Sequence, residues 1–309
     1  MTQQDFVSFL TQRGWEEAAA CRYYNNGIID RSLTVEEWRN TLVGVFCAKH
    51  SNLGAITQMH ECLGKIPEWG DLTKPNLVEY KRYLLTKVAR NSASLYLHRM
   101  AAIMAIHEDK IPAKDFRTAM ALKKEPSQHV ALTEDEVEMI HRYIPRTTAE
   151  EDIKRAFMLE CLCGARSCDI AQITANNIHD GWLTYVSQKT KTETSVPVHR
   201  LLPEYLLKPV HKREYKRAVV NRIIKRICQK CGMTQMVKLY THGKWQTRPK
   251  YELVGSHTAR RSFATQLAQR NVPVPTISRL MGHADVKMTS KYICVEIRNI
   301  GDDAMAFFN

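Results

Sequence analysis

The stretch that decides the fold runs from His257 to Tyr292 and reads HTARRSFATQLAQRNVPVPTISRLMGHADVKMTSKY. His257 and Arg260 stand three residues apart, so a helix would place both side chains on the same side. Residues 275–281 read as a short helix with a proline in its first turn and a glycine as left-handed terminator, which leaves His283 at the helix end. We expect Tyr292 on the next, turn-rich helix.

This combination of side chains suits chemistry on a phosphodiester. The pentavalent transition state gathers negative charge on the non-bridging oxygens, and a guanidinium group offers a planar fork of donors that matches them. Imidazoles add further donors or handle protons. A tyrosine with a pKa of about 10 is a weak nucleophile at neutral pH, so nearby cations or a general base must assist it. The segment indicates an enzyme that cuts and rejoins DNA.

The order His-x-x-Arg, then Gly-His, then Tyr closely resembles the tyrosine recombinases, also called phage-type integrases. The intervals from Arg260 to His283 and to Tyr292 are those expected of that family. The family has a second arginine upstream in a Gly-x-Arg-x-x-Glu setting, and residues 164–169 here read GARSCD. Arg166 therefore matches the family position, whereas Asp169 stands where the family has glutamate and can still accept hydrogen bonds near Arg166.

Between its two arginines the family places a lysine on a β-hairpin. An Asp-Gly turn signal precedes residues 182–186, and residues 182–186 and 194–198 read as strands around a short polar turn. Lys189 follows the first strand and resembles the family position better, with Lys191 as the reserve. The lysine that is not used would be a solvated turn residue.

The resemblance implies a role for each of these residues. Tyr292 would attack the scissile phosphate to form a 3′-phosphotyrosyl bond, and Lys189 would protonate the departing 5′-oxygen. The other catalytic residues would be Arg166, Arg260, His257 and His283, with Asp169 and Lys191 in supporting positions. Bond energy stays in the covalent intermediate, so the expected cofactors are none and the expected metal is none. Taken singly, each residue has an ordinary structural explanation, and the joint pattern carries the inference.

Composition agrees with a polyanionic partner. The chain has 309 residues with 45 Lys and Arg against 32 Asp and Glu, a formal charge of +13 and a pI near 9.3. Such a balance is typical of proteins that displace counterions from double-stranded DNA. We find no apolar stretch long enough to cross a bilayer and no secretory signal at the N-terminus, so we expect no membrane association and a cytoplasmic, nucleoid-associated protein.

The nine cysteines indicate free thiols. Cys228 and Cys231 have the spacing of metal ligands, but a structural zinc site needs a second pair of ligands, and both thiols fall on an apolar helical stripe with residues 215–227. We therefore expect buried thiols. The opposite face of this helix is basic and would contact DNA backbone or solvent, as would Arg261; its members are Lys216, Arg217, Arg222, Lys225, Arg226 and Lys230.

Helix signals divide the chain. Thr133 and Glu136 form a capping box that begins a helix, and Thr34 with Glu37 forms another, whose helix we expect to run through Phe46. The polar residues 123–130 read as a linker. We predict an N-terminal segment at 1–33 whose role is left open, a helical core-binding (DNA-binding) domain at 34–122 and a catalytic domain at 131–309.

The expected fold is mainly α with a small antiparallel β-sheet, to which the Lys189 hairpin and a later pair of strands around residues 242–243 would both contribute. The expected function is site-specific recombination by a synaptic tetramer on DNA, with accessory DNA-bending proteins as further partners. Residues 251–257 look like integrases of mobile elements, which favours integration or excision. The alternatives are a chromosome-dimer resolvase, a DNA invertase, a type IB topoisomerase or a catalytically silent DNA-binding regulator. The apolar tail at 304–309 would serve synapsis or pack within its own subunit.

Overall fold

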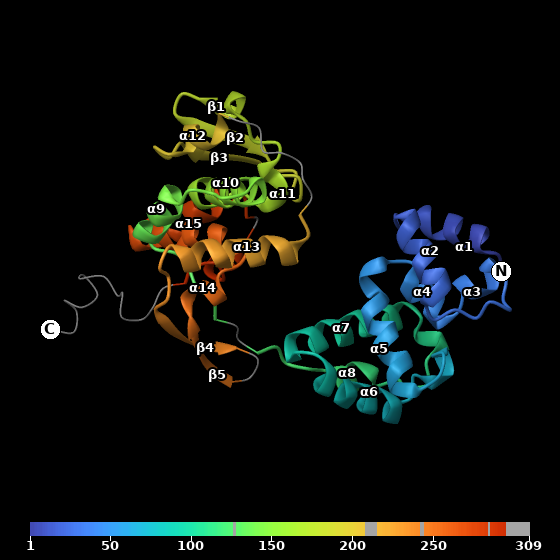
Figure 1. Cartoon of the computed structure of the whole chain (residues 1–309). Helices are drawn as coiled ribbons and strands as arrows, with labels where there is room; N and C mark the ends of the chain where they lie inside the picture. The colour runs from blue at the N-terminus through green and yellow to red at the C-terminus, as the bar shows by residue number, and fades with distance from the viewer. Residues whose placement is uncertain (126–127, 208–214, 242–243, 284, 295–309) are drawn as a thin grey trace. The chain divides into compact units, whose positions relative to one another are not determined.

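The computed structural model describes residues 1–125, 128–207, 215–241, 244–283 and 285–294 (Figure 1). The chain divides into two units, residues 1–126 and residues 127–309. Both are mainly helical, and the described strands all lie in the second unit. The predicted fold class, mainly α with a small antiparallel β component, is confirmed. The turn at 242–243 and the tail at 304–309 lie outside the described residues.

The first unit packs its helices around one apolar core. Phe6 and Leu10 of α1, Trp38 of α3 and Met100 of α7 are buried in the same cluster. The first 33 residues therefore share a core with the helices that follow them. The helices are α1 (Gln3–Thr11), α2 (Glu17–Asn26), α3 (Val35–Arg39), α4 (Leu42–Cys47), α5 (Leu53–Leu63), α6 (Lys74–Lys87), α7 (Arg90–Ile106) and α8 (Phe116–Met120).

The prediction of a single helix from Val35 to Phe46 is wrong, because α3 ends at Arg39 and a second helix, α4, begins at Leu42. The capping box of Thr34 with Glu37 is present and begins α3. Thr41 then caps α4, since its Oγ1 accepts from the Gly44 amide at 3.1 Å. A Cβ on Gly44 would meet the Trp38 carbonyl oxygen at 2.1 Å, so the absence of a side chain allows the two short helices to pack closely.

The second unit is built around α10, which is buried along most of its length and packs against α9, α12, α13 and α15. The predicted capping box of Thr133 with Glu136 begins α9. The helices of this unit are α9 (Glu134–Arg142), α10 (Thr148–Cys163), α11 (Ser167–Ile170), α12 (Leu202–Leu206), α13 (Arg217–Lys230), α14 (Lys250–Leu253), α15 (Thr258–Gln269), α16 (Val274–Leu280) and α17 (Val286–Ser290). In the described part of the chain, no helix is both long and apolar enough for a membrane crossing.

The strands form two sheets where one was expected. Strands β1 (Ile178–His179), β2 (Trp182–Val186) and β3 (Glu193–Pro197) make an antiparallel three-stranded sheet, whereas β4 (Met236–Thr241) pairs only with β5 (Lys244–Pro249). The two sheets lie at opposite ends of the unit (Figure 1). Val237 and Leu239 pack β4 against the same apolar core that contains Leu183 and Tyr185 of β2.

Helix α13 carries the predicted apolar stripe. Ile223, Ile224, Ile227 and Cys228 are buried, and Cys231 is partly buried with its thiol 3.6 Å from the Met139 carbonyl oxygen. Burial raises the pKa of Cys228 to about 12, so this thiol stays protonated at neutral pH. Among the described residues no three His, Cys, Asp or Glu side chains gather as metal ligands would.

Candidate active site

Arg260 is almost completely buried, with 1% of its surface exposed. It lies in the first turn of α15, and its Nη1 donates to the carbonyl oxygen of Gly164, the left-handed residue that ends α10. Its Nη2 donates to the Met281 carbonyl oxygen and contacts His283 Nε2 at 2.9 Å. Two separate segments, the end of α10 and residues 281–283, thus hold one guanidinium group. Burial and then the charge of Arg166 lower the pKa of Arg260.

Arg166, at the start of α11, contacts the same Met281–His283 segment as Arg260. It caps the start of that helix, and its Nη2 donates to the Gly282 carbonyl oxygen at 3.2 Å. Its Nη1 donates to Ser187 Oγ at 2.9 Å, and Ser187 Oγ in turn donates to Asp169 Oδ2 at 3.1 Å. Arg166 and Arg260 therefore bind the consecutive carbonyl groups of Gly282 and Met281.

His283 lies just after α16, where Gly282 has the predicted left-handed conformation with φ of +60°. Because Arg260 can only donate, the His283 Nε2 that it contacts must accept, so the proton lies on Nδ1. That nitrogen contacts Thr289 Oγ1 at 2.9 Å. Burial and the charges of Arg260 and Arg166 lower the pKa of His283 to about 4, which agrees with a neutral ring.

Tyr292 lies in the turn after α17, two residues beyond the helix end, and not on the helix as expected. Its amide donates to the Thr289 carbonyl oxygen at 2.8 Å. The ring centroid is 5.6 Å from Cζ of Arg260, 5.8 Å from Cζ of Arg261 and 5.1 Å from the centroid of the His283 ring. The phenol therefore lies beside the two arginines and the histidine in a single chain.

His257 and Lys189 lie at the rim of this cluster. His257 caps the start of α15 and is exposed, and Lys189 is exposed on the turn between β2 and β3. Lys191, on the same turn, is exposed and has φ of +55°. Desolvation lowers the pKa of His257, and four nearby positive charges lower it further: Arg217, Arg261, Arg260 and Lys189. The charge of Lys189 thus acts on the edge of the arginine cluster.

The predicted DNA-contact residues fall into two groups. Arg261 is half-buried beside Tyr292, with its Nε atom buried and without a hydrogen-bond partner. The basic residues of α13 remain on the surface, where Arg222, Lys225 and Arg226 line an open hollow with Tyr251. Asn221 of α13 accepts from the Ser256 amide at 2.9 Å, so the basic helix adjoins the segment that carries His257.

Three residues near the cluster were not anticipated: Ser187, Thr289 and Glu160. Thr289 and Ser187 are fully buried and hold His283 and Arg166. Glu160 is 5% exposed and accepts from Ser167 Oγ at 2.8 Å. Burial raises the pKa of Glu160 to about 8, so it is largely neutral at pH 7. These are ordinary residue types, and their roles depend on folding contacts that no local pattern displays.

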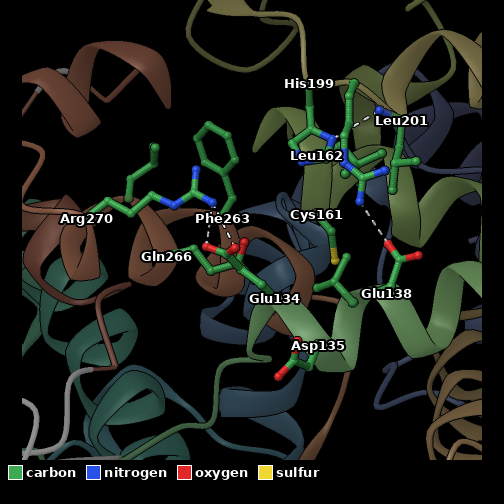
Figure 2. A pocket seen from close by; sticks show the side chains of 13 residues that line it. Glu134, Asp135, Glu138, Cys161, Leu162, His199, Leu201, Phe263, Gln266 and Arg270 are labelled. Atoms are coloured by element: carbon green, nitrogen blue, oxygen red, sulfur yellow. Dashed lines mark hydrogen bonds and ion pairs between the residues drawn. The ribbon is translucent and has the colours of Figure 1, made fainter.

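A separate pocket of about 290 Å³ contains none of the predicted catalytic residues. Figure 2 shows its apolar floor, which includes Cys161, Leu162 and Phe263, and its charged rim. At the rim Arg270 pairs with Glu134 at 2.8 Å, and Arg200 pairs with Glu138 at 3.2 Å. The pocket is thus separate from the predicted catalytic residues, although Phe263 also lies against the Gly164 turn.

Residues 130–297 match the model of the phage integrase family, which is more than half of the chain. The chain belongs to this family. A curated relative, tyrosine recombinase XerD of Halalkalibacterium halodurans, is 25% identical over 242 residues, which cover 72% of this chain and 77% of the relative. The family membership confirms the resemblance that the His257–Tyr292 pattern indicated.

Two solved structures share the tyrosine recombinase fold with this chain. One is XerH site-specific recombinase bound to a palindromic difH substrate in a post-cleavage complex, with a TM-score of 0.62, 13% identity and coverage of 99% of this chain and 94% of that chain. The other is a lambda integrase tetramer bound to a Holliday junction, with a TM-score of 0.55, 18% identity and coverage of 79% and 72%. At these identities the likeness is one of fold.

Proposed function

We propose that this protein is a site-specific DNA recombinase that cleaves and rejoins DNA through a 3′-phosphotyrosyl intermediate, with Tyr292 as nucleophile. The observation that carries the proposal is the Tyr292 ring 5.6 Å from the Arg260 guanidinium carbon and 5.1 Å from the His283 ring. The charge balance of the site supports it too. Arg166, Arg260 and Arg261 gather here, and the Glu160 carboxyl near them is held largely neutral because burial raises its pKa to about 8. Such a site favours an anionic ligand.

The reaction balances without an external energy source. The Tyr292 phenol gives up its proton to solvent, directly or through neutral His257, and its oxygen forms a bond to the scissile phosphorus. The bond from phosphorus to the 5′-oxygen breaks, and Lys189 gives that oxygen its proton. Arg166 and Arg260 stabilise the charge on the non-bridging oxygens, with neutral His257 and His283 as further hydrogen-bonding groups. Attack by the 5′-hydroxyl of a partner strand releases Tyr292 and completes strand exchange. Asp169 and Lys191 support these groups.

The nucleophile is tested by Tyr292→Phe, which removes only one oxygen. On a nicked suicide substrate, wild-type protein should form a covalent protein–DNA adduct and Tyr292→Phe should form none, while binding in a mobility-shift assay stays within about twofold, because other contacts hold the DNA. Tyr205→Phe, on α12, is the matched control and should form adduct normally, because its hydroxyl contacts His141 at 2.9 Å. Adduct formation by Tyr292→Phe at the wild-type rate would refute the assignment.

For the biological role we propose integration or excision of a mobile element, acting as a synaptic tetramer on double-stranded DNA, with accessory DNA-bending proteins as further partners. Lambda integrase, whose fold is similar, forms a tetramer on a Holliday junction, which supports this assembly. The likeness to Xer recombinases favours the alternative, a resolvase or invertase role. Covalent trapping with the ends of the element that encodes the protein, compared with a chromosomal resolution site, distinguishes the two. We place the DNA-binding unit at 34–122, the linker at 123–130 and catalysis at 131–309.

A further inference from the structure

The β2–β3 turn carries a buried hydroxyl, that of Ser187, which lies between Arg166 and Asp169. Ser187 is fully buried and lies two residues before Lys189. Its Oγ accepts a hydrogen bond from Arg166 Nη1 at 2.9 Å and donates one to Asp169 Oδ2 at 3.1 Å. The donor directions agree, since a guanidinium only donates and a carboxylate only accepts. The Ser187 hydroxyl therefore bridges the Arg166 guanidinium group and the Asp169 carboxyl group.

The same residue anchors the turn itself. The Ser187 amide donates to the Thr192 carbonyl oxygen at 2.9 Å, and the Lys191 amide donates to the Ser187 carbonyl oxygen at 2.8 Å. The next amide, of Gln188, donates to Asp169 Oδ1 at 2.8 Å. Asp169 is fully buried, and its two carboxyl oxygens accept from the Ser187 hydroxyl and the Gln188 amide. One carboxylate and one hydroxyl join the Arg166 segment to the turn.

We propose that Ser187 is a positioning residue for Arg166: its buried hydroxyl holds the guanidinium in the orientation that stabilises the scissile phosphate. The proposal rests on the proposed function. A long arginine side chain loses considerable rotamer entropy when it is fixed, and Ser187 and the Gly282 carbonyl oxygen hold its two terminal nitrogens. With Ser187 removed, Arg166 keeps its charge but loses the contact that fixes one side of the fork.

The length of the acid explains why a bridge is required. The contact from Asp169 to Arg166 runs through the Ser187 oxygen, which lies 3.1 Å from Asp169 Oδ2 and 2.9 Å from Arg166 Nη1. Glutamate at this position would extend the carboxylate by about one carbon–carbon bond, roughly 1.5 Å, toward the space that the Ser187 oxygen occupies. Asp169→Glu should therefore clash with Ser187 when introduced alone, but should compensate for Ser187→Ala by contacting Arg166 directly.

The test measures single-turnover cleavage of a nicked suicide substrate by full-length protein. Ser187→Ala should cleave an ordinary phosphodiester about 10- to 100-fold more slowly than wild type, as expected for a misplaced charge group, with DNA affinity unchanged. Ser195→Ala is the matched control, because Ser195 lies on the same hairpin with its Oγ bonded to Thr184 at 2.9 Å. It should cleave at the wild-type rate. The double variant Ser187→Ala with Asp169→Glu should regain most of the lost rate.

Two modified substrates separate positioning of Arg166 from a general structural defect. A methylphosphonate at the scissile position has no negative charge for Arg166 to stabilise, so the ratio of wild-type to Ser187→Ala rates should shrink toward one. A 5′-bridging phosphorothiolate needs little protonation of its leaving group, so it should rescue Lys189→Ala but leave Ser187→Ala slow. Ser187→Cys, which keeps a weak donor and a similar volume, should cleave the phosphodiester at a rate between those of wild type and Ser187→Ala. It replaces the alanine variant in the test if that variant does not fold.

The proposal is overturned if Ser187→Ala or Ser187→Cys cleaves as fast as wild type, if the defect is equal on phosphodiester and methylphosphonate, or if the phosphorothiolate restores the alanine variant. The proposed function fails separately, when wild-type protein forms no adduct or when Tyr292→Phe forms one. Normal adduct formation by wild type together with an unimpaired Ser187→Ala would leave the function standing and remove only the role of Ser187.

Discussion

At the residue scale, the candidate site depends on a buried arginine, Arg260, whose terminal nitrogens are bound by protein groups. Arg260 is almost fully buried, yet its two terminal nitrogens have carbonyl and imidazole partners before any DNA is bound. Burying a guanidinium without partners would be costly, so these contacts stabilise the charge in the free protein. A phosphate would then meet a donor that is already oriented, which is the condition for effective transition-state stabilisation.

Glu160 supplies a prediction at the same scale. Burial raises its pKa to about 8 from the usual 4.5, so between these pH values the folded state binds a proton that the unfolded chain releases. The free energy of unfolding should therefore fall as pH rises from about 5 to 8, by at most about 1.4 kcal/mol per pH unit from this group. Glu160→Gln should remove that slope, because the amide does not ionise and can still accept from Ser167.

The slope is measured by hydrogen exchange of α10 amides at several pH values in the wild type, in Glu160→Gln and in Glu193→Gln, an exposed glutamate of the same unit. Wild type and Glu193→Gln should lose protection together as pH rises. Equal pH slopes in wild type and Glu160→Gln would show that Glu160 ionises normally in the folded protein.

At the element scale, the sequence correctly predicted the features that depend on a few neighbouring residues. Thr34 and Thr133 cap their helices as their capping boxes indicate, Gly282 is left-handed, and the strand from Trp182 to Val186 has its expected bounds. The break at Thr41 was missed because Trp38, Leu42 and Phe46 keep helical spacing across it. The arginine side chains converge through contacts more than 90 residues apart in the chain, such as Arg260 with Gly164, which no local pattern encodes.

The end of α10 supplies the prediction for this scale. Gly164 has φ of +65°, and a Cβ there would lie 2.4 Å from Cδ1 of Phe263. Gly64 ends α5 in the same conformation, with φ of +67°, and an added Cβ would meet nothing within 4 Å. Gly64→Ala should therefore cost only the left-handed strain, about 1 kcal/mol, whereas Gly164→Ala should lose roughly 1–3 kcal/mol more through the clash.

Hydrogen exchange in α5 and α10 measures each loss within its own unit. Gly164→Ala should also slow adduct formation, because the Gly164 carbonyl oxygen accepts from Arg260 and moves with the backbone. Gly64→Ala should leave adduct formation unchanged. The packing argument is wrong if the two substitutions destabilise their helices equally.

At the scale of the whole molecule, positive charge is concentrated in the second unit. Residues 127–309 have 28 Lys and Arg against 18 Asp and Glu, which accounts for most of the net charge of +13. The basic face of α13 adjoins the candidate site, since Arg217 acts on His257 and Asn221 binds the Ser256 amide. A phosphate backbone that enters the arginine cluster would then pass close to this helix, where basic side chains would release condensed counterions.

The last prediction tests that face through the salt dependence of DNA affinity. Arg222→Gln with Arg226→Gln removes two exposed charges from α13, and each lost phosphate contact should reduce the slope of log affinity against log salt by about 1. The control, Arg142→Gln with Arg270→Gln, removes two charges that already pair with Glu138 and Glu134. It should keep the wild-type slope, because those arginines release few counterions. Titrations by fluorescence anisotropy across a range of salt give all three slopes, and equal slopes for the two double variants would exclude α13 as a phosphate-binding face.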